Sequence, residues 1–234
     1  KLGLKADYGD FTQGMKIVEA TEKAVQTVYD MTRTKRAHVD QKATMLTLKL
    51  VNDKGYPLQI TFYIANNDVA YRYTLLPVKD ENPRCAVVYG ETSSFNFPDE
   101  TRTFMTPQIQ PMSGWQRTKP SYEEEFVPDA RLTDKSKYGV GYTFPCLFRI
   151  PNKGNNTWIL ISETGTSSYP GCRLSEYEPT KGYHIAYPQA GENNGFGSEF
   201  ASIPLPSSTP WRTITVGNSL QPIVETTIPY DVVE

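Results

Sequence analysis

The chain reads Leu58-Gln-Ile-Thr-Phe-Tyr-Ile64, then Asn66-Asn-Asp68, then Val69-Ala-Tyr-Arg-Tyr-Thr-Leu75. Every second residue of the two outer segments is apolar, which is the period of a strand with one buried face. The asparagines between them tolerate the positive φ that a tight turn needs. This stretch therefore predicts an antiparallel hairpin. A second turn signal, Asn52-Asp-Lys-Gly55, joins the hairpin to a strand over Met45–Val51.

The same alternation continues along most of the chain. Between Pro98 and Gly141 the sequence is rich in Pro, Gly and charge, which predicts loops with short edge strands. Asp129–Lys137 is the segment closest to a helix, and no segment shows a sustained helical stripe. So many strands with turns at short spacing predict an all-β fold, a large antiparallel β-sandwich that forms a single domain over residues 1–234. The further predicted strands are Met15–Glu19, Val25–Tyr29, Ala86–Tyr89, Pro145–Ile150, Thr157–Ser162, Tyr183–Tyr187, Trp211–Val216 and Ile223–Ile228.

Composition excludes several classes of protein. Charge is balanced, with 24 Lys and Arg against 26 Asp and Glu, so no overall field attracts nucleic acid or anionic lipid. No apolar run is long enough to span a membrane. The 3 cysteines are odd in number and form no CxxC pattern, which argues against a zinc site or a disulfide framework. Cys85 and Cys146 lie in apolar strands and are expected to be buried thiols.

One carboxylate stands at the end of a strand. Trp158-Ile-Leu-Ile-Ser162 delivers Glu163, and Gly165 with the polar run Thr166-Ser-Ser168 follows. A strand positions a side chain more rigidly than a loop does, so Glu163 is a candidate to hold a metal or a sugar hydroxyl. The alternative is a carboxylate that merely ends the strand in solvent.

A second candidate site lies in the Pro- and Gly-rich region. Trp115, Tyr122 and Glu123 would wall a sugar subsite, with the aromatic rings stacked on a pyranose and the carboxylate accepting its hydroxyls. The alternative is that the two aromatic residues pack under a long loop.

Four other residues have mainly structural interpretations. Arg72, between Tyr71 and Tyr73, is expected to form an ion pair or stack on a tyrosine. Trp211 and Arg212 are expected to pin the last strands, with Trp211 buried. His184 would serve acid–base chemistry in a mutarotase-like site, but a half-buried strand histidine with a backbone partner is the simpler hypothesis.

Several phrases of the chain, taken together and in order, carry a resemblance to a known family. These phrases are Leu2-Gly-Leu4 with Asp10-Phe11, Asn66–Tyr73, Trp115, Tyr122-Glu123, Pro145–Phe148, Trp158–Glu163, Tyr169-Pro-Gly-Cys-Arg-Leu174, Pro210-Trp-Arg-Thr-Ile-Thr-Val-Gly217 and Ile223–Ile228. They resemble the N-terminal domain of family 97 glycoside hydrolases, the α-glucosidase and α-galactosidase family typical of Bacteroidetes. Two departures from its pattern are Val69, where the family has Gly, and Phe126, where it has Tyr.

The resemblance implies a supersandwich of the galactose-mutarotase type, placed before a (β/α)8 catalytic barrel that is expected to follow residue 234. The chain's partners would then be its own C-terminal barrel and an α-linked oligosaccharide. The catalytic carboxylates would lie on the barrel, leaving no catalytic residue in this chain, and Glu163 would reach a calcium ion in the active site. A periplasmic or secreted location is implied as well. The family would already have one or two strands before Lys1.

Three functional hypotheses follow. The first is an N-terminal domain that completes the active site of a calcium-dependent, exo-acting α-glycosidase. The second is a free-standing carbohydrate-binding module that uses Trp115 and Tyr122, which binding of α-glucosides would support. The third is a mutarotase-like sugar epimerase, which loss of isomerisation on changing His184 would support.

Overall fold

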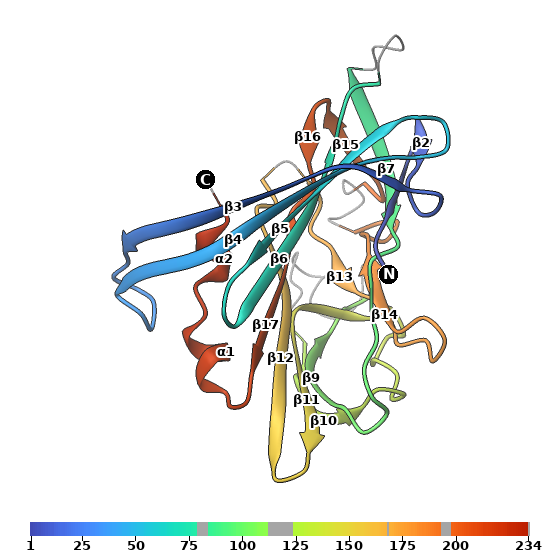
Figure 1. The fold of residues 1–234 in the computed structure, drawn as a ribbon. Coiled ribbons are helices and arrows are strands. Elements are labelled where there is room, and N and C mark those ends of the chain that lie inside the picture. The colour runs from blue at the N-terminus through green and yellow to red at the C-terminus, as the bar shows by residue number, and fades with distance from the viewer. Residues whose placement is uncertain (79–83, 112–123, 168, 193–197, 234) are drawn as a thin grey trace.

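The computed structural model describes residues 1–78, 84–111, 124–167, 169–192 and 198–233 (Figure 1). Strands dominate these residues, and their pairs are antiparallel. They form a long sheet of 13 strands and a smaller sheet of 4 strands, and neither sheet closes on itself. The prediction of an all-β antiparallel sandwich is confirmed.

The long sheet begins with a meander of four strands: β3 (Lys16–Asp30), β4 (His38–Val51), β5 (Pro57–Ile64) and β6 (Asp68–Leu75). The predicted hairpin is present, with Leu58 opposite Leu75 and Ile64 opposite Val69. The two strands predicted near the N-terminus are one strand, β3, which pairs with β4 along its length and extends to one side of the molecule (Figure 1).

The sheet continues from β6 through β17 (Trp211–Gly217), β12 (Asn155–Thr164) and β11 (Tyr142–Asn152). Next to β11 lie β9 (Arg102–Pro107) and then β10 (Val127–Arg131). Asp129–Lys137, the segment closest to a helix in sequence, is not helical: it begins inside β10 and continues as turns. Asp129 has a positive φ of 55°, which a helix does not accommodate.

Short strands complete both sheets. The long sheet also contains β13 (Arg173–Leu174), β14 (Tyr183–Ala186), β8 (Ser94–Phe95) and β16 (Ser207–Ser208). The small sheet has the order β15 (Ala201–Pro204), β7 (Cys85–Glu91), β1 (Leu4–Ala6) and β2 (Gly9–Asp10).

The largest apolar core joins the two sheets. The small sheet contributes inward residues of β1, β7 and β15, and the meander contributes inward residues of β4, β5 and β6. Burial of these side chains supplies the main force that holds the sheets together. Its members include Leu4, Ala86, Val88, Ile203, Leu50, Leu58, Ile60, Tyr71, Tyr73 and Leu75.

The C-terminal segment is helical. Ile223–Ile228 was predicted as a strand, but it spans α1 (Gln221–Glu225) and the start of α2 (Ile228–Asp231). The physical reason is that each helix has a proline in its first turn, Pro222 and Pro229, where a missing N–H costs nothing, whereas a central strand would lose a ladder hydrogen bond. α1 packs beside β17, and α2 lies beside the β3–β4 hairpin (Figure 1), where the Tyr29 hydroxyl donates to Asp231 at 2.7 Å.

All three cysteines are free. Cys146 is buried as predicted, but the expectation for Cys85 was wrong, because it begins β7 at the rim of the small sheet and is exposed. Among the described residues, no helix has the length and apolar character that crossing a membrane requires.

Candidate functional site

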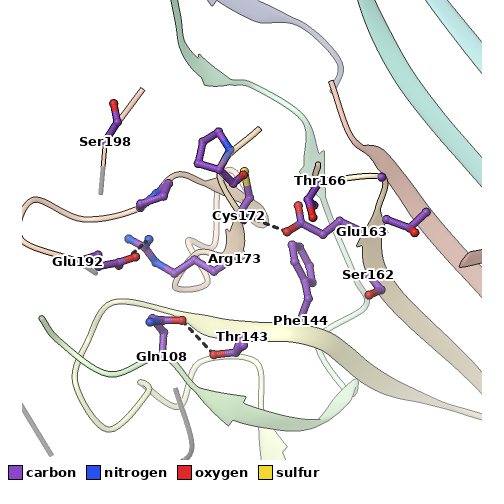
Figure 2. Close-up of a pocket in the computed structure, with 15 residues that line it drawn as sticks. Gln108, Thr143, Phe144, Ser162, Glu163, Thr166, Cys172, Arg173, Glu192 and Ser198 are labelled. Carbon is purple, nitrogen blue, oxygen red and sulfur yellow. Dashed lines mark hydrogen bonds and ion pairs between the residues drawn. The ribbon is translucent and has the colours of Figure 1, made fainter. Parts of the chain in front are cut away.

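A pocket of about 660 Å³ lies beside the last residues of β12 (Figure 2). Several segments surround it: the start of β11, the end of β12, the segment that leads into β13, and the residues that follow β9 and β14. Its wall is mixed in character, with carboxylates, a guanidinium and hydroxyls beside an aromatic ring. The lining includes Gln108, Thr143, Phe144, Ser162, Glu163, Thr164, Cys172, Arg173 and Glu192.

Glu163 occupies one wall of this pocket. It is the second-last residue of β12 and lies directly opposite Arg212 of β17. One carboxylate oxygen accepts a hydrogen bond from the backbone N–H of Cys172 at 2.9 Å, and the other accepts one from the Arg212 guanidinium. Figure 2 shows the carboxylate reaching toward Cys172 beside the ring of Phe144. Its side chain is 10% exposed, so the carboxylate is held in the wall and does not protrude into solvent.

Arg212 is shared between two carboxylates. Its Nε lies 3.3 Å from Glu91 Oε2, and one terminal nitrogen contacts Glu91 Oε1 while the other contacts Glu163. The side chains of Arg212 and Glu91 are 1% and 0% exposed. Because Glu91 ends β7 of the small sheet, the guanidinium links the two sheets.

Glu91 is itself fixed by hydroxyl groups. The Ser93 hydroxyl donates to Glu91 Oε2 at 3.2 Å, and Ser93 Oγ lies 2.9 Å from the hydroxyl of Tyr73. The Tyr73 oxygen in turn accepts the backbone N–H of Gly3 at 2.8 Å. The charged group is therefore embedded in a hydrogen-bonded network, which is the condition for burying charge at acceptable cost.

The electrostatics of the site follow from burial. Burial raises the pKa of Glu163, and the positive charge of Arg212 opposes that rise. Burial alone would lower the pKa of Arg212, but Glu91 outweighs it and holds that pKa well above the ordinary value. Burial also raises the pKa of the Cys172 thiol to about 12. Arg212 is therefore a permanent cation, and Cys172 stays a neutral thiol in the lining of the pocket.

The opposite wall carries a second ion pair. Arg173 lies 3.6 Å from Glu192, donates from Nε to the carbonyl of Val140 at 2.8 Å, and also contacts the carbonyl of Tyr187 (Figure 2). Gln189 donates to the same Glu192 carboxylate at 3.0 Å. Arg173 and Glu192 both have partners within the protein. We therefore give this wall a structural role, which is to shape the pocket.

The other predicted residues lie elsewhere. Trp115, Tyr122 and Glu123 fall outside the described residues. Trp211 is 3% exposed, which confirms its predicted burial. Arg72 does stack on an aromatic ring, but the partner is Trp211, with 4.4 Å from the guanidinium carbon to the ring centroid.

His184 is half-buried in β14, as predicted, and is not part of the pocket described above. Its partner is the side chain of Ser175, whose Oγ lies 2.9 Å from Nδ1 and accepts the His184 backbone N–H at 2.9 Å. Burial lowers the pKa of His184.

The sequence interpretation missed Glu91 and gave Arg212 too small a role. A signal was present for Arg212, since it stands in an otherwise uncharged strand between Trp211 and Thr213. Glu91 gave no comparable signal, because its contact with Arg212 spans 121 positions. Across the part of the chain that the structure describes, no three His, Cys, Asp or Glu side chains cluster as a metal site would require.

Comparisons with known proteins agree with this architecture. The family model described as Glycosyl-hydrolase 97 N-terminal matches residues 1–234. No curated protein sequence matches the chain. A crystal structure of a beta-arabinopyranosidase superposes with a TM-score of 0.92 and 49% identity, covering 100% of this chain and 36% of that protein.

Two further structures share the fold at lower identity. Both are of a glycoside hydrolase family 97 enzyme from Pseudoalteromonas sp. strain K8, one in complex with panose and one with acarbose. Their TM-scores are 0.75 and 0.73 at 18% identity, and each match covers 97% of this chain and 31% of the enzyme. The chain thus spans about a third of the length of the proteins it matches. The chain belongs to the glycosyl-hydrolase 97 N-terminal family.

Proposed function

We propose that this chain is the N-terminal β-sandwich domain of a longer, exo-acting glycoside hydrolase, and that it supports a C-terminal catalytic barrel and lends Glu163 to the active site. The observation that carries the proposal is the match of the whole chain to a domain that makes up about a third of a glycosidase. The pocket beside β12 supports it as well, because it places one rigidly held carboxylate at the wall of a polar cavity.

The catalytic carboxylates belong to the barrel in this proposal. Glycoside cleavage requires two carboxyl groups that flank the scissile bond. The pocket's carboxylates, Glu163 and Glu192, are both engaged with buried arginines, Arg212 and Arg173. Both carboxylates are therefore committed to ion pairs within the domain itself. The role of this domain is therefore to position and stabilise, and the bond cleavage takes place on the barrel.

The substrate class is proposed from the relatives. The 49% identical protein is a beta-arabinopyranosidase, while the 18% identical enzyme was captured with the oligosaccharide panose and with acarbose. A β-L-arabinopyranoside has the ring configuration of an α-D-galactopyranoside and lacks only its exocyclic hydroxymethyl group. We therefore propose that the whole protein acts on β-arabinopyranosides or α-galactosides, and the α-glucosides of the wider family are the second candidate. The natural substrate would be an oligosaccharide with such a terminal sugar.

Calcium is the proposed metal of the complete active site, with Glu163 as one ligand. The residues present fit this role in part. Calcium prefers hard oxygen ligands and takes six to eight of them, and Glu163 offers a carboxylate that faces the pocket with one hydrogen bond on each oxygen. The remaining ligands would come from outside the described residues. When bound, calcium would supply a fixed positive charge beside the sugar.

The proposal is tested with Glu163→Gln in the full-length protein. The amide keeps the shape and one acceptor oxygen but loses the charge, so the fold should persist while calcium affinity and turnover fall. Glu19→Gln is the matched control, because Glu19 forms an exposed ion pair with Lys49 on the β3–β4 hairpin. Turnover is measured on nitrophenyl β-L-arabinopyranoside, α-D-galactopyranoside and α-D-glucopyranoside. Wild-type calcium dependence and rate in the Glu163 variant would refute the assignment, and the ranking of the three substrates decides the sugar.

The location of the whole protein is proposed from the family as the periplasm or the cell exterior. Fractionation of the native source, with detection of the full-length protein, tests this directly. Recovery of the protein in the cytoplasmic fraction alone would contradict it.

A further inference from the structure

The buried group formed by Glu91, Arg212 and Glu163 has an uneven charge. One guanidinium faces two carboxylates, so the group carries a net charge of −1 when both carboxylates are ionised. Arg212 and Glu91 are buried with side chains 1% and 0% exposed, whereas Glu163 is 10% exposed and lines the pocket. The excess negative charge is thus presented to the pocket only through Glu163.

The two carboxylates contact the Arg212 guanidinium in different ways. Glu91 takes two nitrogens of the guanidinium, Nε and one terminal nitrogen, and so neutralises it with a two-point contact. Glu163 takes the remaining terminal nitrogen on one oxygen and the Cys172 N–H on the other. Each Glu163 oxygen therefore keeps a free lone pair while the carboxylate is held from two sides.

A structural purpose alone does not require this arrangement. Arg212 is already neutralised by Glu91, so a single pair would satisfy the buried charge, and a third charged group in the same place adds a desolvation cost. The contact with Arg212 holds the Glu163 side chain in one conformation. A free glutamate has several rotamers, and holding it in one before a cation arrives removes that entropy cost from binding.

We infer that Arg212 and Glu91 are positioning residues for a cation site at Glu163, Arg212 by fixing the carboxylate and Glu91 by neutralising Arg212 so that Glu163 keeps its attraction for a cation. The inference rests on the proposed function of Glu163. It assigns to the small sheet, through Glu91 of β7, an electrostatic contribution to a site that Glu91 does not touch.

The test compares three variants of the full-length protein. Glu91→Gln leaves the Glu163 carboxylate in place but cancels the net charge of the group. Glu163→Gln removes the carboxylate itself. In both variants Arg212 keeps one carboxylate partner, so the buried cation stays paired and the fold should survive. Asp68→Asn is the control, since Asp68 is also a buried carboxylate of the long sheet and accepts hydroxyls of Thr215 at 2.5 Å and Thr226 at 2.7 Å, away from the pocket.

Calcium affinity is measured by titration calorimetry, and thermal unfolding is recorded with and without calcium. Glu91→Gln should weaken calcium binding at least tenfold, while Asp68→Asn should lower the melting temperature with affinity unchanged. At saturating calcium, Glu91→Gln should recover turnover and Glu163→Gln should not, because only the second lacks the charged carboxylate that contacts the ion.

Each other outcome overturns the inference. If Glu163→Gln weakens calcium binding and Glu91→Gln does not, Glu91 is only structural and the proposed function of Glu163 stands. If Glu91→Gln and Asp68→Asn weaken it equally, the effect is general destabilisation. If Glu163→Gln leaves affinity unchanged, the proposed function fails and the positioning role fails with it.

Discussion

Replacement of Trp211 by alanine should destabilise the fold strongly. The side chain is 3% exposed and packs in a cluster with Tyr63, Ala70 and Ile228, which links β5, β6, β17 and α2. Truncating a buried tryptophan costs about 3–5 kcal/mol. The Arg72 guanidinium lies 4.4 Å from the ring centroid, and losing this contact adds about 0.5–2 kcal/mol. Together these costs are about 3.5–7 kcal/mol, and at about 2–4 °C per kcal/mol for a domain of this size the melting temperature should fall by roughly 7–28 °C.

The matched variant is Trp211→Phe. It keeps a ring under Arg72, and it removes an indole N–H that has no hydrogen-bond partner among the described residues. A buried donor without a partner is costly, so its removal offsets part of the lost volume, and the net cost should be about 1–2 kcal/mol. Thermal unfolding followed by far-ultraviolet circular dichroism gives the melting temperature of both variants, and urea unfolding gives their free energies of unfolding. An unchanged melting temperature for Trp211→Ala would refute the reasoning and would indicate that Trp211 serves an interface with another domain.

Three other predictions follow from the structure. The isolated chain should fold but should not hydrolyse nitrophenyl glycosides, since the catalytic carboxylates are proposed to lie on the barrel; turnover near that of a whole enzyme would contradict this. Under native conditions a thiol reagent should modify Cys85 quickly and Cys146 and Cys172 only after unfolding, because burial raises the pKa of both buried thiols; three equal rates would be inconsistent with the fold. The lowered pKa of His184 means that the native state binds a proton less readily than the unfolded chain, so stability is complete above about pH 6.5 and declines as the pH falls through that value toward the folded pKa. His184→Gln should flatten this decline, and an unaltered pH profile of urea midpoints would assign it to other groups.

The elements that the sequence predicted correctly are those defined by local pattern. The β5–β6 hairpin follows from alternation and an Asn-rich turn, both of which are contained within Leu58–Leu75. The burial of Trp211 follows from its place at the start of an apolar strand after a proline-rich segment. Such features depend on neighbouring residues, so no knowledge of distant contacts was needed.

In short segments without a distinctive period, the sequence pattern does not decide between strand and helix or between burial and exposure. Ile223–Ile228 is apolar enough for a strand, and periodicity alone does not separate a strand from one turn of helix. Pro222 and Pro229 decided the outcome locally, and packing of α1 beside β17 and of α2 beside the β3–β4 hairpin completed it. Cys85 lies in an apolar run, but it is exposed because it is the first residue of β7, at the end of the strand.

The sequence by itself therefore determined the class of fold, the main hairpins and the strand that carries Glu163. Only the tertiary structure decided what surrounds that carboxylate. Arg212 meets Glu163 across 49 positions and Glu91 across 121, and these contacts exist because β12 and β17 pair in one sheet while β7 packs from the other. The sequence around a charged side chain does not show which distant residue it pairs with. Its burial, its neutralisation and the net charge it presents are properties of the assembled sheets.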